Sequence, residues 1–313
     1  MKTAIIAIGG NALIKEGEDG NIYQQFTNAR DTCAKLIKVV EMGYDIIITH
    51  GNGPQVGDTI RRHENARKII PPYPLGMCVS ETVGSMGYML QQTMQNTVKK
   101  SKAVRKDVVT IITQVVVDEQ DPSFQNPTKP IGQFFSKEDI GEIAKAEKWN
   151  VVEDSGRGWR RVVPSPRPIR IVEKDTIQHL LEKGKIVIAC GGGGIPVIQL
   201  EDGTLDGVEA VIDKDYASSK LAQQLDLDEL IILTAVDKVS VNFGKPDQKD
   251  LDTMSVAEAG KHLENGQFPP GSMGPKIRAA IEFIENGGRR AIIASHENLV
   301  EAMAGKAGTR IIP

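Results

Sequence analysis

The sequence has few of the features that mark secreted or membrane proteins. Its cysteines, Cys33, Cys78 and Cys190, are odd in number and show no CxxC spacing, so neither a disulfide framework nor a structural zinc site is expected. No apolar run reaches the roughly 18 residues of a membrane span. The N-terminal apolar stretch Ala4–Ile8 is too short for the core of a signal peptide. These features predict a cytoplasmic protein without a membrane segment.

An excess of one sign of charge is also missing. The chain has 38 Lys and Arg against 41 Asp and Glu, a net charge of −3, so nothing favours a nucleic-acid partner or an acidic membrane surface. Aromatic residues make up only 4% of the chain, but 40% is hydrophobic and 25% charged. That balance is ordinary for a globular protein and excludes a disordered chain.

The common nucleotide-binding and hydrolase motifs are absent as well. Gly271–Lys276 has the wrong interval for G-x-x-x-x-G-K-[ST]. After Gly51-Asn52-Gly53 the next glycine, Gly57, comes one place too late for G-x-G-x-x-G. No HExxH, G-x-S-x-G or EF-hand pattern occurs. Any phosphate site in this protein must therefore be built in another way.

Glycine is the residue in excess. The chain has 31 glycines in 313 residues, where an average content of about 7% would give roughly 22. Ten of them fall in four loops, which account for the surplus. These are Gly9 and Gly10; Gly51 and Gly53; Gly191 to Gly194; and Gly271 and Gly274.

Three of these loops directly follow apolar runs that predict buried strands. Glycine leaves backbone N–H groups open to a ligand, and successive exposed amides bind anions. Ligands of open α/β sheets bind at the carboxyl ends of the strands. The three loops together therefore predict a polyanionic ligand, most simply phosphates, although each loop alone could equally be a tight turn.

Short β-branched apolar runs alternate with helical patterns along the chain. Because the runs are apolar on both faces, the alternation predicts a parallel α/β sheet covered by helices on both faces. The runs are Ala4–Ile8, Ile46–Thr49, Val108–Val117, Ile186–Ala189, Leu230–Thr234 and Ala291–Ala294. The helical patterns are Gln24–Met42, Asp175–Lys183, Tyr216–Gln224 and Pro275–Asn286.

One segment, from about 118 to 168, breaks this alternation. It holds six of the 16 prolines and both tryptophans, and Val151-Val152 with Trp159–Val163 predicts a hairpin around Ser155–Gly158. So long a stretch is not expected to be a structureless loop. We expect a small inserted subdomain within a single domain spanning residues 1–313.

Three lysines are candidates for contact with phosphates. Lys276 follows the Gly271–Gly274 loop at a predicted helix start, where the helix dipole favours anions. Lys129 lies between prolines in the inserted segment, and Lys214 lies between two aspartates. Phosphoryl transfer needs cations around a dispersed negative charge. In a chain with 38 Lys and Arg, a surface role is the alternative for each.

The acidic neighbours of Lys214 and one histidine are also notable. Asp213 and Asp215 could hold lysines in place, coordinate Mg²⁺ with the phosphates, or cap a helix. His50 directly precedes the Gly51–Gly53 loop, where a hydrogen-bonded loop histidine is favoured over a catalytic one. No arrangement supports Ser-His-Asp chemistry.

Six segments, in order along the chain, closely resemble carbamate kinases. They are Ile8–Ala12, His50–Gly57, Asn126–Gly132, Val162–Pro168, Ala210–Asp215 and Gly271–Lys276. The resemblance implies an amino-acid-kinase fold, a three-layer α/β/α sandwich with a mainly parallel central sheet, an inserted protruding subdomain and a homodimer. It also implies reversible, Mg²⁺-dependent phosphoryl transfer between ATP and carbamate, giving ADP and carbamoyl phosphate. The transfer would be direct and in line, without a phosphoenzyme. It would need no general base, because carbamate is already an anionic nucleophile.

The resemblance assigns roles to residues as well. Lys129 and Lys214 would neutralise the phosphoryl oxygens, Asp215 would orient the lysines, and Lys276 would hold the nucleotide phosphates. Mg²⁺ would be held mainly by those phosphates, and no metal ligand is assigned. The carbamate and the moving phosphoryl group would lie against Gly9, Gly10, Asn11, Gly51, Asn52 and Gly53. The nucleotide site, within about 175–313, would include Gly192, Gly193, Asp213, Thr234, Ala235, Val236, Asp237, Met273 and Gly274. The run Gly191–Gly194 is expected to line the floor between the two substrates.

Ala7 separates this chain from other kinases of that fold. Acetylglutamate, UMP and isopentenyl phosphate kinases generally have a lysine two places before the first strand-end glycine pair, where this chain has Ala7. The alternatives that stay open are a relative acting on another small carboxylate, an enzyme that works as a carbamoyl-phosphate synthesiser, and a non-catalytic nucleotide sensor. Arginine fermentation, purine breakdown and biosynthesis all stay open as its metabolic setting.

Overall fold

The computed structural model describes residues 2–15, 17–147, 149–153 and 158–313. Its centre is an eight-stranded sheet of order β15-β17-β16-β12-β1-β2-β9-β3. Every neighbouring pair in it is parallel except β16 and β17. Its strands are β1 (Lys2–Ile8), β2 (Tyr44–His50), β3 (Val108–Thr110), β9 (Ile186–Ile188), β12 (Glu229–Thr234), β15 (Thr253–Ser255), β16 (Arg290–Ser295) and β17 (Thr309–Ile312). The expected mainly parallel α/β fold is confirmed.

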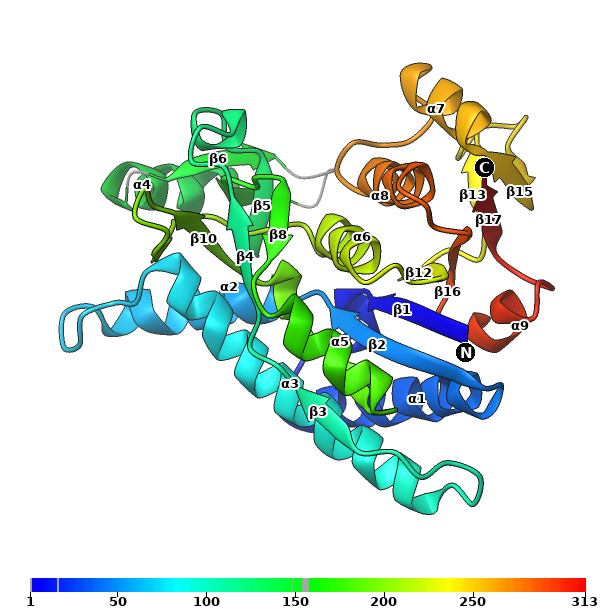
Figure 1. The fold of residues 1–313 in the computed structure, drawn as a ribbon. Helices are drawn as coiled ribbons and strands as arrows, with labels where there is room; N and C mark the ends of the chain where they lie inside the picture. Colours follow the sequence, from blue (N-terminus) through cyan, green and yellow to red (C-terminus); the bar gives the residue numbers. More distant parts are fainter. Residues whose placement is uncertain (1, 16, 148, 154–157) are drawn as a thin grey trace.

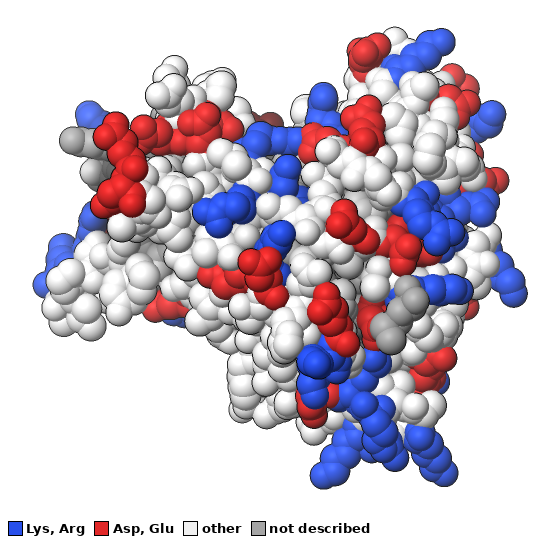
Figure 2. Space-filling model, in the orientation of Figure 1, with Lys and Arg blue, Asp and Glu red and all other residues white. Residues whose placement is uncertain are grey.

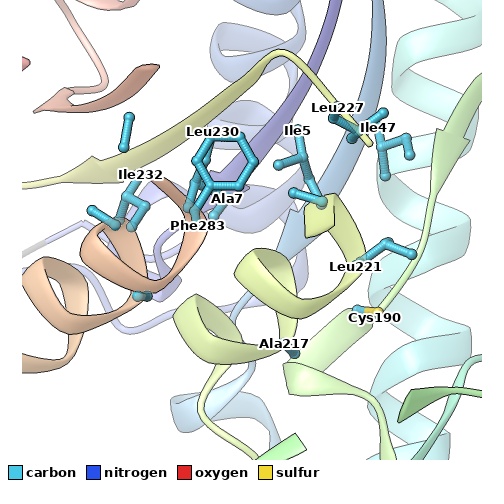
Figure 3. Close-up of a cluster of buried hydrophobic side chains, with 14 of the residues drawn as sticks. Ile5, Ala7, Ile47, Cys190, Ala217, Leu221, Leu227, Leu230, Ile232 and Phe283 are labelled. Atoms are coloured by element: carbon cyan, nitrogen blue, oxygen red, sulfur yellow. The ribbon is translucent and has the colours of Figure 1, made fainter. Parts of the chain in front are cut away.

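The central strands bury both of their faces, as their unbroken apolar runs predict. In β1, Ile5 and Ala7 belong to one core cluster, whereas Ala4, Ile6 and Ile8 belong to the other. Successive side chains of a strand point to opposite faces, so each face of β1 packs into its own core. Figure 3 shows the first cluster, to which Ile5 and Ala7 contribute together with Phe283 and Leu221.

Helices cover both faces of the sheet, which gives three layers (Figure 1). The face of Ile5 is covered by α5 (Lys174–Glu182), α6 (Lys214–Gln224), α7 (Val256–Glu264) and α8 (Met273–Glu285). The face of Ile6 is covered by α1 (Ile22–Glu41), α3 (Leu75–Lys100) and α9 (Leu299–Met303). Helix α1 begins two residues before its predicted start because Asn21 and Gln24 form a capping box there.

The run Val108–Val117 was expected to be one strand, and this is wrong. It divides into β3 and β4 (Gln114–Val117), which belong to different sheets. The two strands are separated by residues 111–113, where the Thr113 hydroxyl donates to the carbonyl of Ile111 and accepts from the amide of Cys190. A mostly β-branched run does not reveal such an interruption. The second sheet has the order β11-β10-β4-β8, with β8 (Pro168–Ile171), β10 (Ile195–Gln199) and β11 (Leu205–Gly207).

The segment that breaks the alternation has a sheet of its own. Strands β5 (Lys129–Phe135), β6 (Asn150–Glu153) and β7 (Trp159–Val163) form it in the order β5-β7-β6, with α4 (Lys137–Glu147) alongside. The predicted hairpin is confirmed by the antiparallel pairing of β6 and β7. Of its predicted turn, residues 155–157 lie outside the described residues. In the described part of the chain, the remaining elements are α2 (Gly53–Ala66), the hairpin of β13 (Val239–Val241) and β14 (Lys249–Leu251), and the short 3-10 helices Gly10–Ala12, Pro122–Phe124 and Gly191–Gly193.

Surface charges of both signs are interspersed on the face shown in Figure 2, in agreement with the small net charge. None of the helices in the described part of the chain is both long enough and apolar enough to cross a membrane.

Candidate active site

Three glycine loops lie side by side at one edge of the central sheet. The loops that begin at Gly9, Gly51 and Gly191 follow β1, β2 and β9, which are consecutive parallel strands. The amide of Gly51 donates to the carbonyl of Ile8 at 2.9 Å, which joins the first two loops. The predicted convergence of these loops at strand carboxyl ends is therefore confirmed.

A cavity of about 170 Å³ opens beside these loops. Its walls include the three candidate lysines and both aspartates of the Asp213–Asp215 segment. Lys129 comes from β5 of the inserted segment, and the other four residues come from the main body. The other lining residues are Gly51, Asn52, Gly53, Val56, Pro130, Ile131, Gly192, Val211, Ile212, Gly271, Ser272 and Pro275. The structure thus brings together residues that lie more than 200 positions apart in the chain.

Asp215 stands between two of the lysines. Its Oδ1 accepts from Lys214 Nζ at 2.5 Å and its Oδ2 from Lys276 Nζ at 3.0 Å. All three groups are largely buried, with side-chain exposures of 3%, 12% and 17% for Asp215, Lys214 and Lys276. Burial by itself would raise the pKa of Asp215, but the two lysine charges hold it well below its usual value.

The two lysines respond differently to the same carboxylate. Burial lowers the pKa of Lys214, and Asp215 offsets this only in part. Burial also acts to lower the pKa of Lys276, but Asp215 and Asp213 outweigh it and raise that pKa above the usual value. The geometry therefore provides a cationic ammonium group at Lys276, at the start of α8, where the helix dipole adds to the attraction for anions.

The third lysine pairs with the other aspartate. Lys129 Nζ donates to Asp213 Oδ2 at 2.5 Å, and Asp213 Oδ1 accepts from the amide of Asp215, so that Asp213 also caps α6. Capping and ion pairing, offered as alternatives by the sequence, occur together. The Lys129 side chain is 34% exposed, more than Lys214 or Lys276.

Glycines let these groups approach one another closely. A Cβ on Gly51 would lie 3.3 Å from the Lys214 side chain and 3.4 Å from the amide nitrogen of Gly10. A Cβ on Gly274 would lie 3.0 Å from the carbonyl of Pro269. The start of α8 therefore lies close against the preceding turn. Gly10 and Gly51 thus lie close together, whereas Gly9 faces the carbonyl of Leu233. Met273 packs against the core cluster on the face of Ile5.

Sequence reasoning missed one contact that places Lys129. Gly57 of α2 lies against Gly132 of β5, and a Cβ on Gly57 would come within 2.3 Å of the Gly132 Cα. Both glycines lie in segments that resemble carbamate kinases, but nothing local shows that they touch. Their contact seats the inserted segment on the main body beside the cavity.

Part of the predicted nucleotide wall lies elsewhere. Thr234 and Ala235 line a separate hollow with Ala12 and His296, on the α1 side of the sheet. Val236 and Asp237 follow in the turn towards β13, where Asp237 accepts from Asn298 Nδ2 at 2.8 Å. Asn11 lies in the 3-10 helix after Gly9, and its side chain is outside the described part of the structure.

The described residues offer no preformed metal site. No group of three or more His, Cys, Asp or Glu side chains among them could hold a metal ion. The carboxylates nearest the cavity, Asp213 and Asp215, already accept from lysines and from the Asp215 amide. This donor set does not fit a protein-held Mg²⁺.

Comparisons with known proteins give one consistent result. The model of the amino acid kinase family matches residues 2–295. The chain is 48% identical over 315 residues to the carbamate kinase of Thermococcus kodakarensis, with 100% of this chain and 99% of that protein covered.

Solved structures show the same similarity. Carbamate kinase from Giardia lamblia bound to citric acid has a TM-score of 0.93 at 40% identity, with 99% of this chain and 98% of that chain covered. The same Giardia lamblia enzyme bound to AMP-PNP has a TM-score of 0.91 at 42% identity, with the same coverage.

Proposed function

This chain belongs to the carbamate kinases of the amino acid kinase family, and we propose that it transfers a phosphoryl group reversibly between ATP and carbamate. It is a phosphotransferase, as its relatives are. The observation that carries the proposal is the meeting of Lys129, Lys214 and Lys276 at one cavity beside the strand-end glycine loops. Three cations and a set of exposed amides suit a phosphoryl group whose charge is spread over several oxygens.

In the proposed reaction the carbamate oxygen attacks the γ-phosphorus of ATP directly. One P–O bond forms to carbamate while the P–O bond to the β-phosphate breaks, and ADP leaves. Carbamate is already an anion, so no general base is needed, and no phosphoenzyme forms. Lys129 and Lys214 stabilise the charge on the moving phosphoryl oxygens, and Asp215 holds Lys214 and Lys276 in place.

We propose that the two substrates approach from different loops. Carbamate and the moving phosphoryl group lie against Gly9, Gly10, Asn11 and the Gly51–Gly53 loop. The nucleotide phosphates lie against Lys276 and the start of α8, where Gly271 and Ser272 line the cavity. The Giardia lamblia relative binds AMP-PNP, and by similarity we propose that this chain also binds a nucleotide.

Mg²⁺, in this proposal, enters with the nucleotide rather than at a protein site. The aspartates beside the cavity hold lysines, so the phosphate oxygens of ATP or ADP are the ligands that remain for the ion. When bound, Mg²⁺ neutralises charge on the β- and γ-phosphates.

We further propose a cytoplasmic homodimer in which residues 118–168 form the inserted subdomain. Support for the dimer comes from large apolar side chains exposed on α3 and on the chain that leads to it. They include Ile69 (86% exposed), Ile70, Tyr73, Met77 and Tyr88. Exposed apolar groups gathered in one region are typical of an interface. The oligomeric state can be measured by sedimentation equilibrium.

The test of the function is ATP formation from ADP and carbamoyl phosphate, with Mg²⁺ and over a range of pH. Acetyl phosphate and other acyl phosphates serve as matched substrates. We expect carbamoyl phosphate to be used far more efficiently than the others. Preference for another acyl phosphate would identify a relative with a different acceptor. Nucleotide binding without any turnover would identify a sensor, and either result would overturn the proposal.

A further inference from the structure

His50 lies buried behind the loop that borders the cavity. It is the last residue of β2, is 1% exposed, and directly precedes the Gly51–Gly53 loop. Its Nδ1 lies 3.3 Å from the carbonyl oxygen of Gly51, so the tautomer with hydrogen on Nδ1 donates to that carbonyl. Its Nε2 has no hydrogen-bond partner among the described residues. Burial lowers the pKa of His50 to about 4, and the ring is therefore neutral at neutral pH.

The ring packs directly against the Gly191–Gly194 loop. A Cβ on Gly191 would lie 2.5 Å from His50 Nε2 and 2.8 Å from Cε1, so only glycine leaves room for the imidazole. Asn52, which follows Gly51, packs against the same glycine run in the same way: a Cβ on Gly192 would lie 2.3 Å from Asn52 Nδ2. That amide nitrogen donates to Thr82 Oγ1 at 2.8 Å. Both side chains that flank Gly51 are thus fitted against this glycine run.

The same run also contacts the lysine-bearing segment. A Cβ on Gly193 would lie 2.1 Å from the carbonyl oxygen of Ile212, the residue before Asp213. Gly192 and Gly193 have φ values of +65° and +96°, which L-residues rarely adopt. Side chains added at Gly191, Gly192 or Gly193 would therefore meet His50, Asn52 or Ile212, which are parts of the protein itself.

These contacts make Gly191–Gly193 a spacer between the substrate loop and the lysine segment. The peptide group is planar and trans, so fixing the Gly51 carbonyl also fixes the direction of the Asn52 N–H, which points the opposite way. An anion-binding loop depends on such orientation, because its amides must be aimed before the ligand arrives.

We propose that His50 is a positioning residue for the acyl-phosphate substrate. Its bond to the Gly51 carbonyl and its packing on Gly191 set the amides of the 51–53 loop at a fixed place relative to Lys214. His50 acts as a neutral wedge and exchanges no proton with substrate. This inference rests on the proposed function, in which the 51–53 loop binds the carbamate end of carbamoyl phosphate.

The first experiment separates substrate placement from general stability. His50→Leu keeps apolar bulk against Gly191 but loses the donor, whereas His50→Asn keeps an N–H donor near the Nδ1 position. For His50→Leu we expect KM for carbamoyl phosphate to rise about tenfold, as for the loss of one well-placed hydrogen bond. KM for ADP and the thermal midpoint should stay close to wild type, and His50→Asn should recover part of the loss.

The second experiment tests the packing on Gly191. Gly191→Ala places a methyl group against the imidazole and should also raise KM for carbamoyl phosphate. Combining it with His50→Ala removes the ring, and the double variant should have a lower KM for carbamoyl phosphate than Gly191→Ala alone. Gly260→Ala in α7 is the matched control, because a Cβ there meets nothing within 4 Å.

Three outcomes would overturn the inference. Wild-type kinetics in His50→Leu would show that the ring positions nothing. Equal changes in KM for both substrates, together with a lower thermal midpoint, would show a purely structural role. If the wild-type protein formed no ATP from ADP and carbamoyl phosphate, the proposed function would fail and this inference with it.

Discussion

Two groups of charges face the cavity, one of three residues and one of two, and they are built differently. Asp215 holds Lys214 and Lys276, all three from the main body and none more than 17% exposed. Asp213 holds Lys129, which comes from the inserted segment and is 34% exposed. One unit is buried and shares a single carboxylate between two cations, and the other joins two separate parts of the fold.

This difference separates a fixed part of the site from a part that depends on docking. A buried carboxylate between two lysines is costly to disrupt, because removing it leaves like charges buried and uncompensated. A partly exposed ion pair contributes little to stability. The position of Lys129 therefore depends less on its pairing with Asp213 than on how β5 is seated on α2.

The largest expected effect is that of Asp215→Asn, which removes the carboxylate shared by Lys214 and Lys276. Leaving Lys214 and Lys276 buried without their counter-charge should lower the free energy of unfolding by about 3 kcal/mol. Turnover should fall by roughly 10³-fold, because both lysines lose their orientation. Denaturant unfolding and steady-state kinetics at pH 7 measure the two effects. Asp175→Asn is the control, since Asp175 is 91% exposed beside Lys174.

The same variant gives a pH signature. The folded pKa of Asp215 is depressed, so its stabilising contribution is present above the unfolded pKa of about 3.9 and is lost as pH falls through the folded value. The stability difference between wild type and Asp215→Asn should be constant from about pH 7 to pH 5 and shrink below about pH 4. A difference that grew on acidification would contradict this account.

A smaller effect is expected for Lys129→Met, which breaks the ion pair between Lys129 and Asp213. Turnover should fall about 10²-fold through loss of one cation at the phosphoryl group. The thermal midpoint should hardly change, because the ion pair is partly exposed. Lys214→Met should lower turnover and the midpoint together, so the pair of variants tests the contrast directly. Lys15→Met is the control, because Lys15 forms a surface ion pair with Asp31. Equal thermal midpoints for the Lys129 and Lys214 variants would argue against a buried, fixed group of charges distinct from a partly exposed one.

The smallest effect is expected for Gly57→Ala, which disturbs only the seat of the inserted segment. The new Cβ would lie 2.3 Å from the Gly132 Cα, so β5 must shift and Lys129 with it. Turnover should fall about tenfold, and the loss should be much smaller in a chain that already carries Lys129→Met, since coupled sites are not additive. Gly141→Ala in α4 is the control, because its Cβ meets nothing within 4 Å. If the losses of turnover from Gly57→Ala and Lys129→Met were additive, Gly57→Ala would lower turnover by a route that does not involve Lys129.

The sequence predicted the parallel sheet and the location of three glycine loops well, because both depend on local patterns. Unbroken apolar runs mark strands buried on two faces, and the glycines that follow β1, β2 and β9 mark strand ends. The same reasoning failed at Val108–Val117. The interruption at Thr113, whose hydroxyl accepts from the distant Cys190 amide, depends on a contact that the sequence of the run does not show.

The Gly191–Gly194 run shows where sequence reasoning reaches its limit. Its composition indicated that side chains are excluded there, and the expectation was that they would block the substrates. The structure places His50, Asn52 and Ile212 against the first three of these glycines, so exclusion by the protein itself is sufficient. Only Gly192 of this run lines the cavity, and its role towards nucleotide stays a prediction.

By itself, then, the sequence determined which segments become buried strands and where the backbone is left bare of side chains. Burial periodicity and glycine conformation are local properties, and each is written within a few consecutive residues. The tertiary structure alone decided which carboxylate holds which lysine. Lys129 and Asp213 are 84 residues apart, and Asp215 and Lys276 are 61 apart. Such pairs form only when the sheet, the helices and the inserted segment have packed, because electrostatic attraction between them depends on distance and burial rather than on order along the chain.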